Sequence, residues 1–293
     1  VTFSEDSELK SIGKFALSES SIEKLVIPSS VIVFGKAWCN GTENLTEIEI
    51  IRNQRENVIL YNNEILVGKS NLESPDFDVL LFARRDIEKV TIPSFIKIID
   101  SFSFDSCNML NQISFADNSK LQIIGNSAFY NCYSLLSISL PESLTSIGSY
   151  VFGYCNFRTF SIPENVEEIE SMTFTDCVNL ETITIPEKVG YIDNELFFNC
   201  INLQSIQILA NITSIGSYSF CNCEKLQSIS IPESVTAIFE LAFCNCSSLE
   251  TLIIPANVST IETYAFAGCD SLSYVLYLGE KNPTYGDEIF YDT

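Results

Sequence analysis

A unit of 23 residues recurs along this chain, and this repetition constrains the fold more than any other feature. Copies that begin at Leu180, Leu226 and Leu249 share the pattern L-x-x-I-x-I-P-x-x-V-x-x-I-x-x-x-x-F-x-x-C-x-x. One such unit cannot bury its apolar positions alone, whereas stacked units form a continuous core. The repetition therefore predicts a solenoid.

Within each copy, alternating residue types indicate a short strand that a proline ends. Ile229 and Ile231 alternate with Ser228 and Ser230, as expected for a strand with one buried face. Proline follows in the same slot of other copies, where its missing N–H ends the hydrogen-bond ladder. These prolines are Pro28, Pro93, Pro141, Pro163, Pro186, Pro232 and Pro255.

The segments 27–31, 140–155 and 215–223 carry the signature I-x-I-P-x-x-V-x-x-I-G-x-x-A-F-x-x-C. In these residues the chain resembles the BspA-type leucine-rich repeat family of surface proteins. The resemblance implies an α/β-type repeat solenoid over residues 1–293, a right-handed stack of about 12 turns. A parallel concave β-sheet and short, largely irregular convex segments are expected. The resemblance also implies export to the cell surface or secretion, adhesion, and no catalytic residues or cofactor.

The charge of the chain argues against several classes of partner. Lys and Arg total 16 against 38 Asp and Glu, which gives a net charge of −22. Binding to nucleic acid or to anionic membranes rests on clustered cations, so neither partner is expected. No apolar run reaches the roughly 18 residues that a spanning helix needs, so no direct membrane insertion by this segment is expected. Because the sequence opens inside a repeat, we expect the natural chain to extend upstream.

Histidine is absent from the chain, which limits its catalytic chemistry. Ser-His-Asp and Cys-His catalysis and most zinc sites require it. Carboxylate pairs such as Glu167 and Glu168 are expected to be solvated surface rather than an acid–base pair. No catalytic, cofactor-binding or metal-binding residues are expected.

The repeat rhythm breaks over residues 51–88, which we interpret as an irregular, hairpin-like insertion. Strands are expected on either side of Asn62-Asn63, since asparagine tolerates the positive φ angles of a tight turn. Residues 51–97 hold seven basic and seven acidic side chains, so this region is neutral within an acidic chain. Insertions in solenoids project from one face and often carry binding sites.

Two basic residues of this insertion are candidate partner contacts. Arg84 and Arg85 lie close to Phe82 in the sequence, and arginine and large apolar residues dominate interface hot spots. The alternative interpretation is that both arginines neutralise nearby acids such as Asp86 and Glu88.

The exposed face of the sheet is the second candidate contact surface. Its expected members are Ser205, Gln207, Ser228, Ser230 and Thr251, with Ile253 and Tyr274 at the C-terminal end. Hydroxyls and amides can bind a glycan or an extended polypeptide through hydrogen bonds. The alternative is that Ser and Thr merely suit exposed strand positions.

The cysteines form a column in the predicted stack, because one slot of the repeat holds most of them. The column consists of Cys107, Cys132, Cys155, Cys177, Cys200, Cys223, Cys246 and Cys269. Buried thiols are the preferred interpretation, with disulfides or a metal site as alternatives. Cys221 and Cys244 lie outside the column, one turn apart, and their thiol or disulfide state is left open.

Five N-x-[ST] motifs are candidate glycosylation sites in an exported protein. Their asparagines are Asn40, Asn44, Asn211, Asn245 and Asn257. Together these features predict a non-enzymatic, surface or extracellular, adhesin-like protein that binds a protein or glycan ligand on a host cell or matrix. An intracellular interaction scaffold and a carboxylate-dependent hydrolase are the alternatives.

Overall fold

The computed structural model describes residues 1–4, 7–52, 56–73 and 75–293, which form strands, turns and irregular segments without a helix. Within these residues there is consequently no helix of the length and apolarity needed to cross a membrane. The chain divides into two compact units, which we call the N-terminal unit (Val1–Ser143) and the C-terminal unit (Leu144–Thr293). The prediction of one solenoid domain over 1–293 stays a prediction.

The N-terminal unit combines repeat turns with an irregular region. Its strands are β1 (Ser11–Ile12), β2 (Lys24–Pro28), β3 (Val33–Phe34), β4 (Glu47–Ile51), β5 (Ile59–Tyr61), β6 (Ile65–Gly68), β7 (Val79–Ala83), β8 (Lys89–Ile92), β9 (Ile98–Ile99), β10 (Gln112–Phe115) and β11 (Ile123–Ile124). Parallel pairs join β1 to β3, β2 to β4, β8 to β10, β7 to β9 and β9 to β11. The exceptions are β5–β6 and β6–β7, which are antiparallel.

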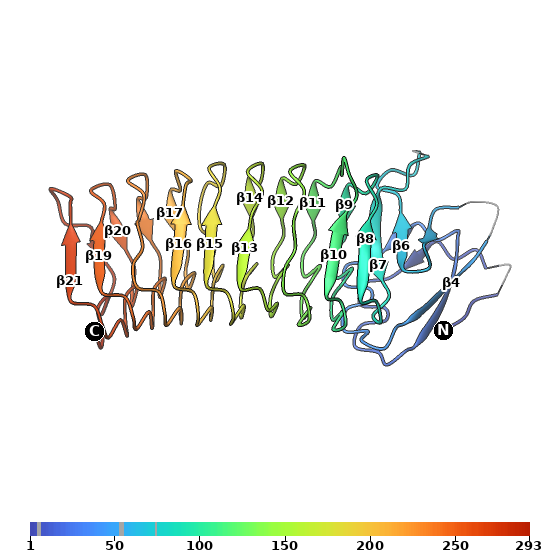
Figure 1. The fold of residues 1–293 in the computed structure, drawn as a ribbon, viewed down its shortest axis with the longest axis horizontal. Coiled ribbons are helices and arrows are strands. Elements are labelled where there is room, and N and C mark those ends of the chain that lie inside the picture. Colours follow the sequence, from blue (N-terminus) through green and yellow to red (C-terminus); the bar gives the residue numbers. More distant parts are fainter. Residues whose placement is uncertain (5–6, 53–55, 74) are drawn as a thin grey trace. The chain divides into compact units, whose positions relative to one another are not determined.

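The C-terminal unit is a regular parallel stack, seen in Figure 1 as successive short arrows from β13 to β21. Its strands are β12 (Ser146–Ile147), β13 (Thr159–Ser161), β14 (Glu168–Ile169), β15 (Thr182–Ile185), β16 (Ser205–Ile208), β17 (Ser214–Ile215), β18 (Ala237–Ile238), β19 (Thr251–Ile254), β20 (Thr260–Ile261), β21 (Tyr274–Tyr277) and β22 (Thr284–Tyr285). The register follows the 23-residue period, since Thr182 pairs with Ser205.

A ladder of phenylalanine rings fills the core of the C-terminal unit. Phe174, Phe197, Phe220, Phe243 and Phe266 are fully buried, one from each turn. Neighbouring rings in this series are stacked, with centroids 5.1–5.5 Å apart. Because phenylalanine recurs in one slot of the repeat, its rings pack against each other from turn to turn. This packing helps to hold neighbouring turns together.

The cysteine column lies beside this ladder and bonds the turns together. In the C-terminal unit, Cys177, Cys200, Cys223, Cys246 and Cys269 each donate to the backbone carbonyl of a phenylalanine in the preceding turn, as Cys200 does to Phe174 (3.2 Å). The cysteines are present as thiols, and those of the column are completely buried. The preferred interpretation of the column as buried thiols is therefore confirmed.

The predicted parallel solenoid of about 12 turns is confirmed. Two local features differ from expectation. Most turns have a second short strand at the later isoleucine slot, such as β18, whereas the repeat pattern predicts one strand in each copy. The segment around Ile229 keeps the alternating burial of a strand but lies outside the hydrogen-bonded strands.

Candidate functional site

The insertion over 51–88 supplies three strands of the N-terminal unit. β5 and β6 form the expected hairpin, and Asn62 and Asn63 at its tip have φ angles of 51° and 59°. β6 pairs with β7, and β7 continues in parallel with β9 of the repeat region. The insertion is therefore joined to the sheet of this unit by hydrogen bonds. Residues 53–55 and 74 of the insertion lie outside the described residues.

Phe82 and Arg85 are buried, so the expectation that they contact a partner is wrong. Phe82 packs in the core of the N-terminal unit, and the guanidinium of Arg85 lies over its ring at 4.3 Å. Arg85 donates to the carbonyls of Ser103 (2.9 Å) and Phe102 (3.2 Å). The arginine thus serves as an internal donor that ties β7 to the following turn.

Arg84 points to the surface beside the hairpin. Its Nη2 lies 2.7 Å from Oδ2 of Asp86, and its Nη1 donates to the carbonyl of Asn63 at 3.0 Å. This is the contact that the alternative interpretation gave for Arg84, neutralisation of a nearby acid. The side chain keeps 24% of its surface exposed, so partner contact by Arg84 stays a proposal.

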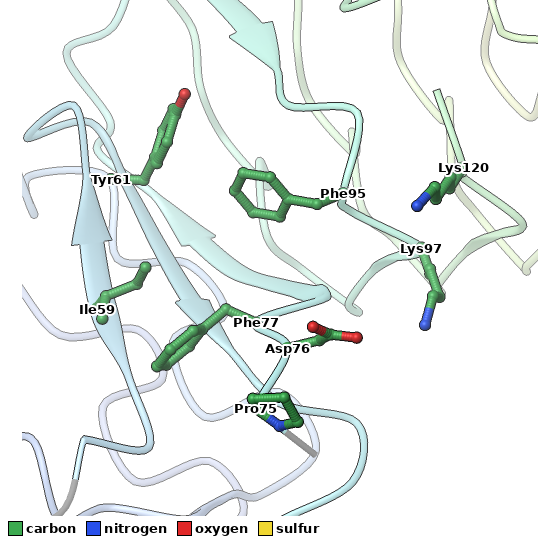
Figure 2. Close-up of a pocket in the computed structure, with 8 residues that line it drawn as sticks. All are labelled: Ile59, Tyr61, Pro75, Asp76, Phe77, Phe95, Lys97 and Lys120. Carbon is green, nitrogen blue, oxygen red and sulfur yellow. The ribbon is translucent and has the colours of Figure 1, made fainter. Parts of the chain in front are cut away.

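A pocket opens next to this hairpin, and four stretches of the N-terminal unit form its wall (Figure 2). We call it the aromatic pocket. Its lining residues are Ile59, Tyr61, Pro75, Asp76, Phe77, Phe95, Lys97 and Lys120. Its volume of about 430 Å³ lies within the range of small-molecule sites. The repeat region and the insertion both contribute to it, so the pocket lies where the rhythm of the repeat breaks.

Aromatic and charged groups lie on different sides of the pocket. Tyr61 and Phe95 meet edge to face, with ring centroids 5.6 Å apart, and Phe77 lies on the same side. Figure 2 shows Lys97 and Lys120 on the other side, with Asp76 between the rings and the lysines. An apolar wall facing two cations suits a ligand that has an apolar surface and a negative charge.

Ion pairs and hydrogen bonds hold the charged side of the pocket in place. Lys97 Nζ lies 3.2 Å from Oδ2 of Asp78, whose side chain is 6% exposed. Burial alone would raise the pKa of Asp78, but hydrogen bonds from the amide and hydroxyl of Ser70 and from Lys97 together lower it. Among the described residues, Lys120 has no ion-pair partner within 4.0 Å. Lys120 is therefore the cation best placed to meet an anionic ligand.

The aromatic pocket was not predicted from the sequence, although one slot of the repeat contains a signal for it. The second residue after the proline is Ser143, Asn165, Lys188 or Ser234 in other copies, but Phe95 follows Pro93. Phe95 thus places an aromatic side chain in an otherwise polar slot, and this side chain is 37% exposed in the structure. Comparing slots rather than scanning for catalytic motifs would have found it.

The exposed strand face of the C-terminal unit has the predicted orientation. Ser205, Gln207, Ser228, Ser230 and Thr251 are all exposed. At the C-terminal end, Ile253 and Tyr274 are 50% and 53% exposed on the paired strands β19 and β21. Their solvent exposure is as expected, and their role as partner contacts stays a proposal.

The candidate glycosylation sites differ in their surroundings. Asn44, Asn211, Asn245 and Asn257 are exposed, whereas Asn40 is half-buried. The hydroxyl of Thr42, which completes the Asn40 motif, is buried and donates to the carbonyl of Cys39 at 2.6 Å. Glycosylation of these five sites stays a prediction.

Across the described residues, no group of three or more Cys, Asp or Glu side chains is arranged to hold a metal ion. A buried cluster of charged and thiol groups is instead structural. It joins Arg85 to Cys39, Cys107 and Asp105 inside the N-terminal unit. The aromatic pocket is the candidate ligand site because it combines aromatic rings with charged side chains.

A model of BspA-type leucine-rich repeat regions matches residues 1–77, 77–203 and 167–293. The chain belongs to the BspA-type leucine-rich repeat family. This assignment rests on nearly the whole chain and agrees with the register of the stacked turns. No curated protein matches the sequence.

Solved structures share the fold of this BspA-type chain. A leucine-rich repeat protein from Eubacterium ventriosum is 26% identical with a TM-score of 0.68, over 80% of this chain and 62% of that one. This chain thus aligns with less than two thirds of that protein. The pneumococcal vaccine antigen PcpA is 20% identical with a TM-score of 0.55, over 96% of this chain and 68% of that one. The similarity to PcpA shows a shared fold and nothing further.

Proposed function

We propose that this BspA-type chain is a non-enzymatic, adhesin-like binding protein, at the cell surface or secreted, and that the aromatic pocket holds its ligand. The ligand class that fits is a carboxylate-bearing glycan of a host cell or matrix. The observation that carries the proposal is the pair of rings, Tyr61 and Phe95, facing Lys97 and Lys120 within one pocket. Family membership supports the binding role, because repeat solenoids present extended surfaces to partners.

The chemistry of an acidic sugar matches each side of the pocket. The C–H face of a pyranose ring is apolar and can pack against Tyr61, Phe77 and Phe95. A carboxylate accepts hydrogen bonds from ammonium groups, which Lys120 and Lys97 supply, and Asp76 can accept from a sugar hydroxyl. On a chain of net charge −22, the Lys120 ammonium has no ion-pair partner among the described residues and is the group that an anionic ligand would meet.

A glycan array probed with the purified chain, followed by calorimetric titration of the best binder, tests this function. Phe95→Ala and Lys120→Glu each change one side of the pocket, and both side chains are exposed enough for the fold to tolerate the change. We expect each variant to lose at least about tenfold in affinity, since a lost contact of 1.4 kcal/mol has that effect.

Lys225→Glu is the matched control for Lys120→Glu. It makes the same charge change at an exposed lysine of the C-terminal unit, where Lys225 Nζ donates to Asn202 Oδ1 at 2.6 Å. This variant should bind like the original chain. Equal binding of neutral and carboxylated glycans, or full binding by both pocket variants, would refute the proposal.

The exposed end of the C-terminal sheet favours a second candidate, docking of a protein partner. Ile253, Tyr274 and Leu276 present apolar side chains on adjacent strands. Tyr274→Lys should abolish capture of a partner from host-surface extracts while glycan binding is unchanged. Localisation of the protein in its native cell separates both candidates from an intracellular scaffold.

A further inference from the structure

Two cysteines outside the buried column lie on adjacent turns of the C-terminal unit. Cys221 follows Phe220, and Cys244 follows Phe243 in the next turn. Backbone hydrogen bonds fix their register on both sides, from Phe220 N to Ala242 O and from Asn222 N to Cys244 O, both 2.8 Å. Adjacent turns held at strand spacing bring the two Cα atoms to about 5 Å, within the range that disulfides span.

The two thiols contact each other through a hydrogen bond. This bond lowers the pKa of Cys244 to about 7 and, together with burial, raises the pKa of Cys221. Cys244 is half-buried, whereas Cys221 is buried, so one thiol of the pair meets solvent and the other lies behind it. A thiol of low pKa that solvent can reach is the more reactive kind.

The column thiols two residues away have different surroundings. Cys223 and Cys246 have no exposed surface and donate to the carbonyls of Phe197 and Phe220 at 3.3 Å and 3.2 Å. Burial raises the pKa of both thiols well above its usual value. Each of these two turns therefore holds an unreactive column thiol, Cys223 or Cys246. Two residues before it lies a thiol, Cys221 or Cys244, that contacts the other member of its pair.

We propose that Cys221 and Cys244 are a redox-active pair that forms a reversible disulfide between adjacent turns, with a low-molecular-weight disulfide as the oxidant. This modification site lies outside the aromatic pocket and does not depend on the proposed ligand. It converts two turns that are held by hydrogen bonds into two turns that are covalently linked.

The exchange balances in two steps. The Cys244 thiolate attacks one sulfur of the small disulfide, whose S–S bond breaks and releases one small thiolate, leaving a mixed disulfide on Cys244. Cys221 gives its proton to solvent, and its sulfur attacks Cys244 Sγ, which releases the second small thiolate. The cysteine pair loses two electrons, and the small disulfide becomes two thiols once the thiolates are protonated.

Incubation of the reduced chain with glutathione disulfide, followed by alkylation and mass spectrometry, tests the pair. Trypsin cleaves after Lys225, between the two cysteines, so the disulfide joins the peptides 189–225 and 226–281. We expect an intact mass lower by two hydrogens and this one cross-link. The cross-linked fraction should rise with the ratio of glutathione disulfide to glutathione and reverse on reduction.

Single variants separate the roles of the two thiols. Cys221→Ser should retain glutathione on Cys244 as a stable mixed disulfide, and Cys244→Ser should take up none. Cys223→Ala serves as the matched control and should still form the cross-link, with its fold checked by circular dichroism. Stable glutathione on Cys244 of the unaltered chain, a cross-link through Cys223 and Cys246, or no reaction at all would each overturn the proposal.

Discussion

Replacing Arg85 with methionine should strongly destabilise the N-terminal unit, although a charged residue in an insertion would ordinarily be read as surface. Methionine keeps a flexible chain of similar length but removes the guanidinium that lies over Phe82. The carbonyls of Ser103 and Phe102 then lose the guanidinium donor and keep only a backbone donor, the N–H of Ala83 and of Asp105. We expect the free energy of unfolding to fall by about 3 kcal/mol.

The magnitude follows from opposing contributions. Two hydrogen bonds from a charged donor contribute roughly 1.5–3 kcal/mol each. The stacking of the cation on Phe82 adds about 1–2 kcal/mol. Against these, the variant no longer has to bury a charge, which costs several kcal/mol. Breaking a buried charged network from one side still costs about 3 kcal/mol in comparable proteins.

The effect of Arg85→Met should also depend on pH through Asp105. Burial raises the pKa of this carboxyl, and the positive charge of Arg85 opposes that rise. Without Arg85 the folded-state pKa of Asp105 rises further above its unfolded value. The contribution of Asp105 to stability is then fully present at pH below its unfolded-state pKa. It is lost as the pH rises through its folded-state pKa. The variant should therefore lose more stability at pH 7 than at pH 4.

Urea unfolding followed by tryptophan fluorescence measures this loss. Trp38 is the single tryptophan of the chain, and its ring centroid lies 5.7 Å from that of Phe82, so it reports on this core. Arg84→Ala is the matched control and should cost less than about 1 kcal/mol, because its ion pair with Asp86 is partly exposed. Equal losses for both variants, or a loss independent of pH, would refute the reasoning.

Three further perturbations test other parts of the fold. Phe220→Ala opens a cavity between the rings of Phe197 and Phe243 and should cost about 4 kcal/mol in urea unfolding of the C-terminal unit. Asn63→Val should lower the free energy of unfolding by about 1–2 kcal/mol, because φ is 59° at this position and a β-branched residue is strained there. Asn63→Gly should be nearly neutral in the same urea unfolding experiment. Stability from Asp78, whose folded pKa is lowered, should be retained above pH about 4 and lost as pH falls further, and Asp78→Asn should flatten that acid limb.

Much of the fold could be predicted from the sequence because each slot of the repeat has one environment. Phenylalanine recurs in one slot, and its rings stack from turn to turn in the structure. Cysteine recurs in another, and its thiols are buried. The register of β15 against β16 follows from the period alone. Periodicity determines such features because every copy must fit against the next.

The insertion was harder to predict, because periodicity says nothing about a segment that interrupts it. The hairpin could be predicted from Asn62-Asn63, whose backbone conformation is a local property. The burial of Arg85 could not, since it depends on how β7 pairs with β6 and β9. The aromatic pocket also depends on tertiary structure, because Tyr61, Phe77 and Phe95 come from separate segments.

A residue that departs from its slot has one of two explanations, and burial decides between them. In a stack, each slot meets the same slot of the neighbouring turns, so an unusual side chain must find its own partners or face solvent. Arg85 finds partners in the core, and its effect is on stability. Phe95 faces a pocket, and Cys244 meets both solvent and Cys221. Exposed departures from the repeat are therefore where binding and reactivity are expected in this chain, and the regular slots between them supply the scaffold.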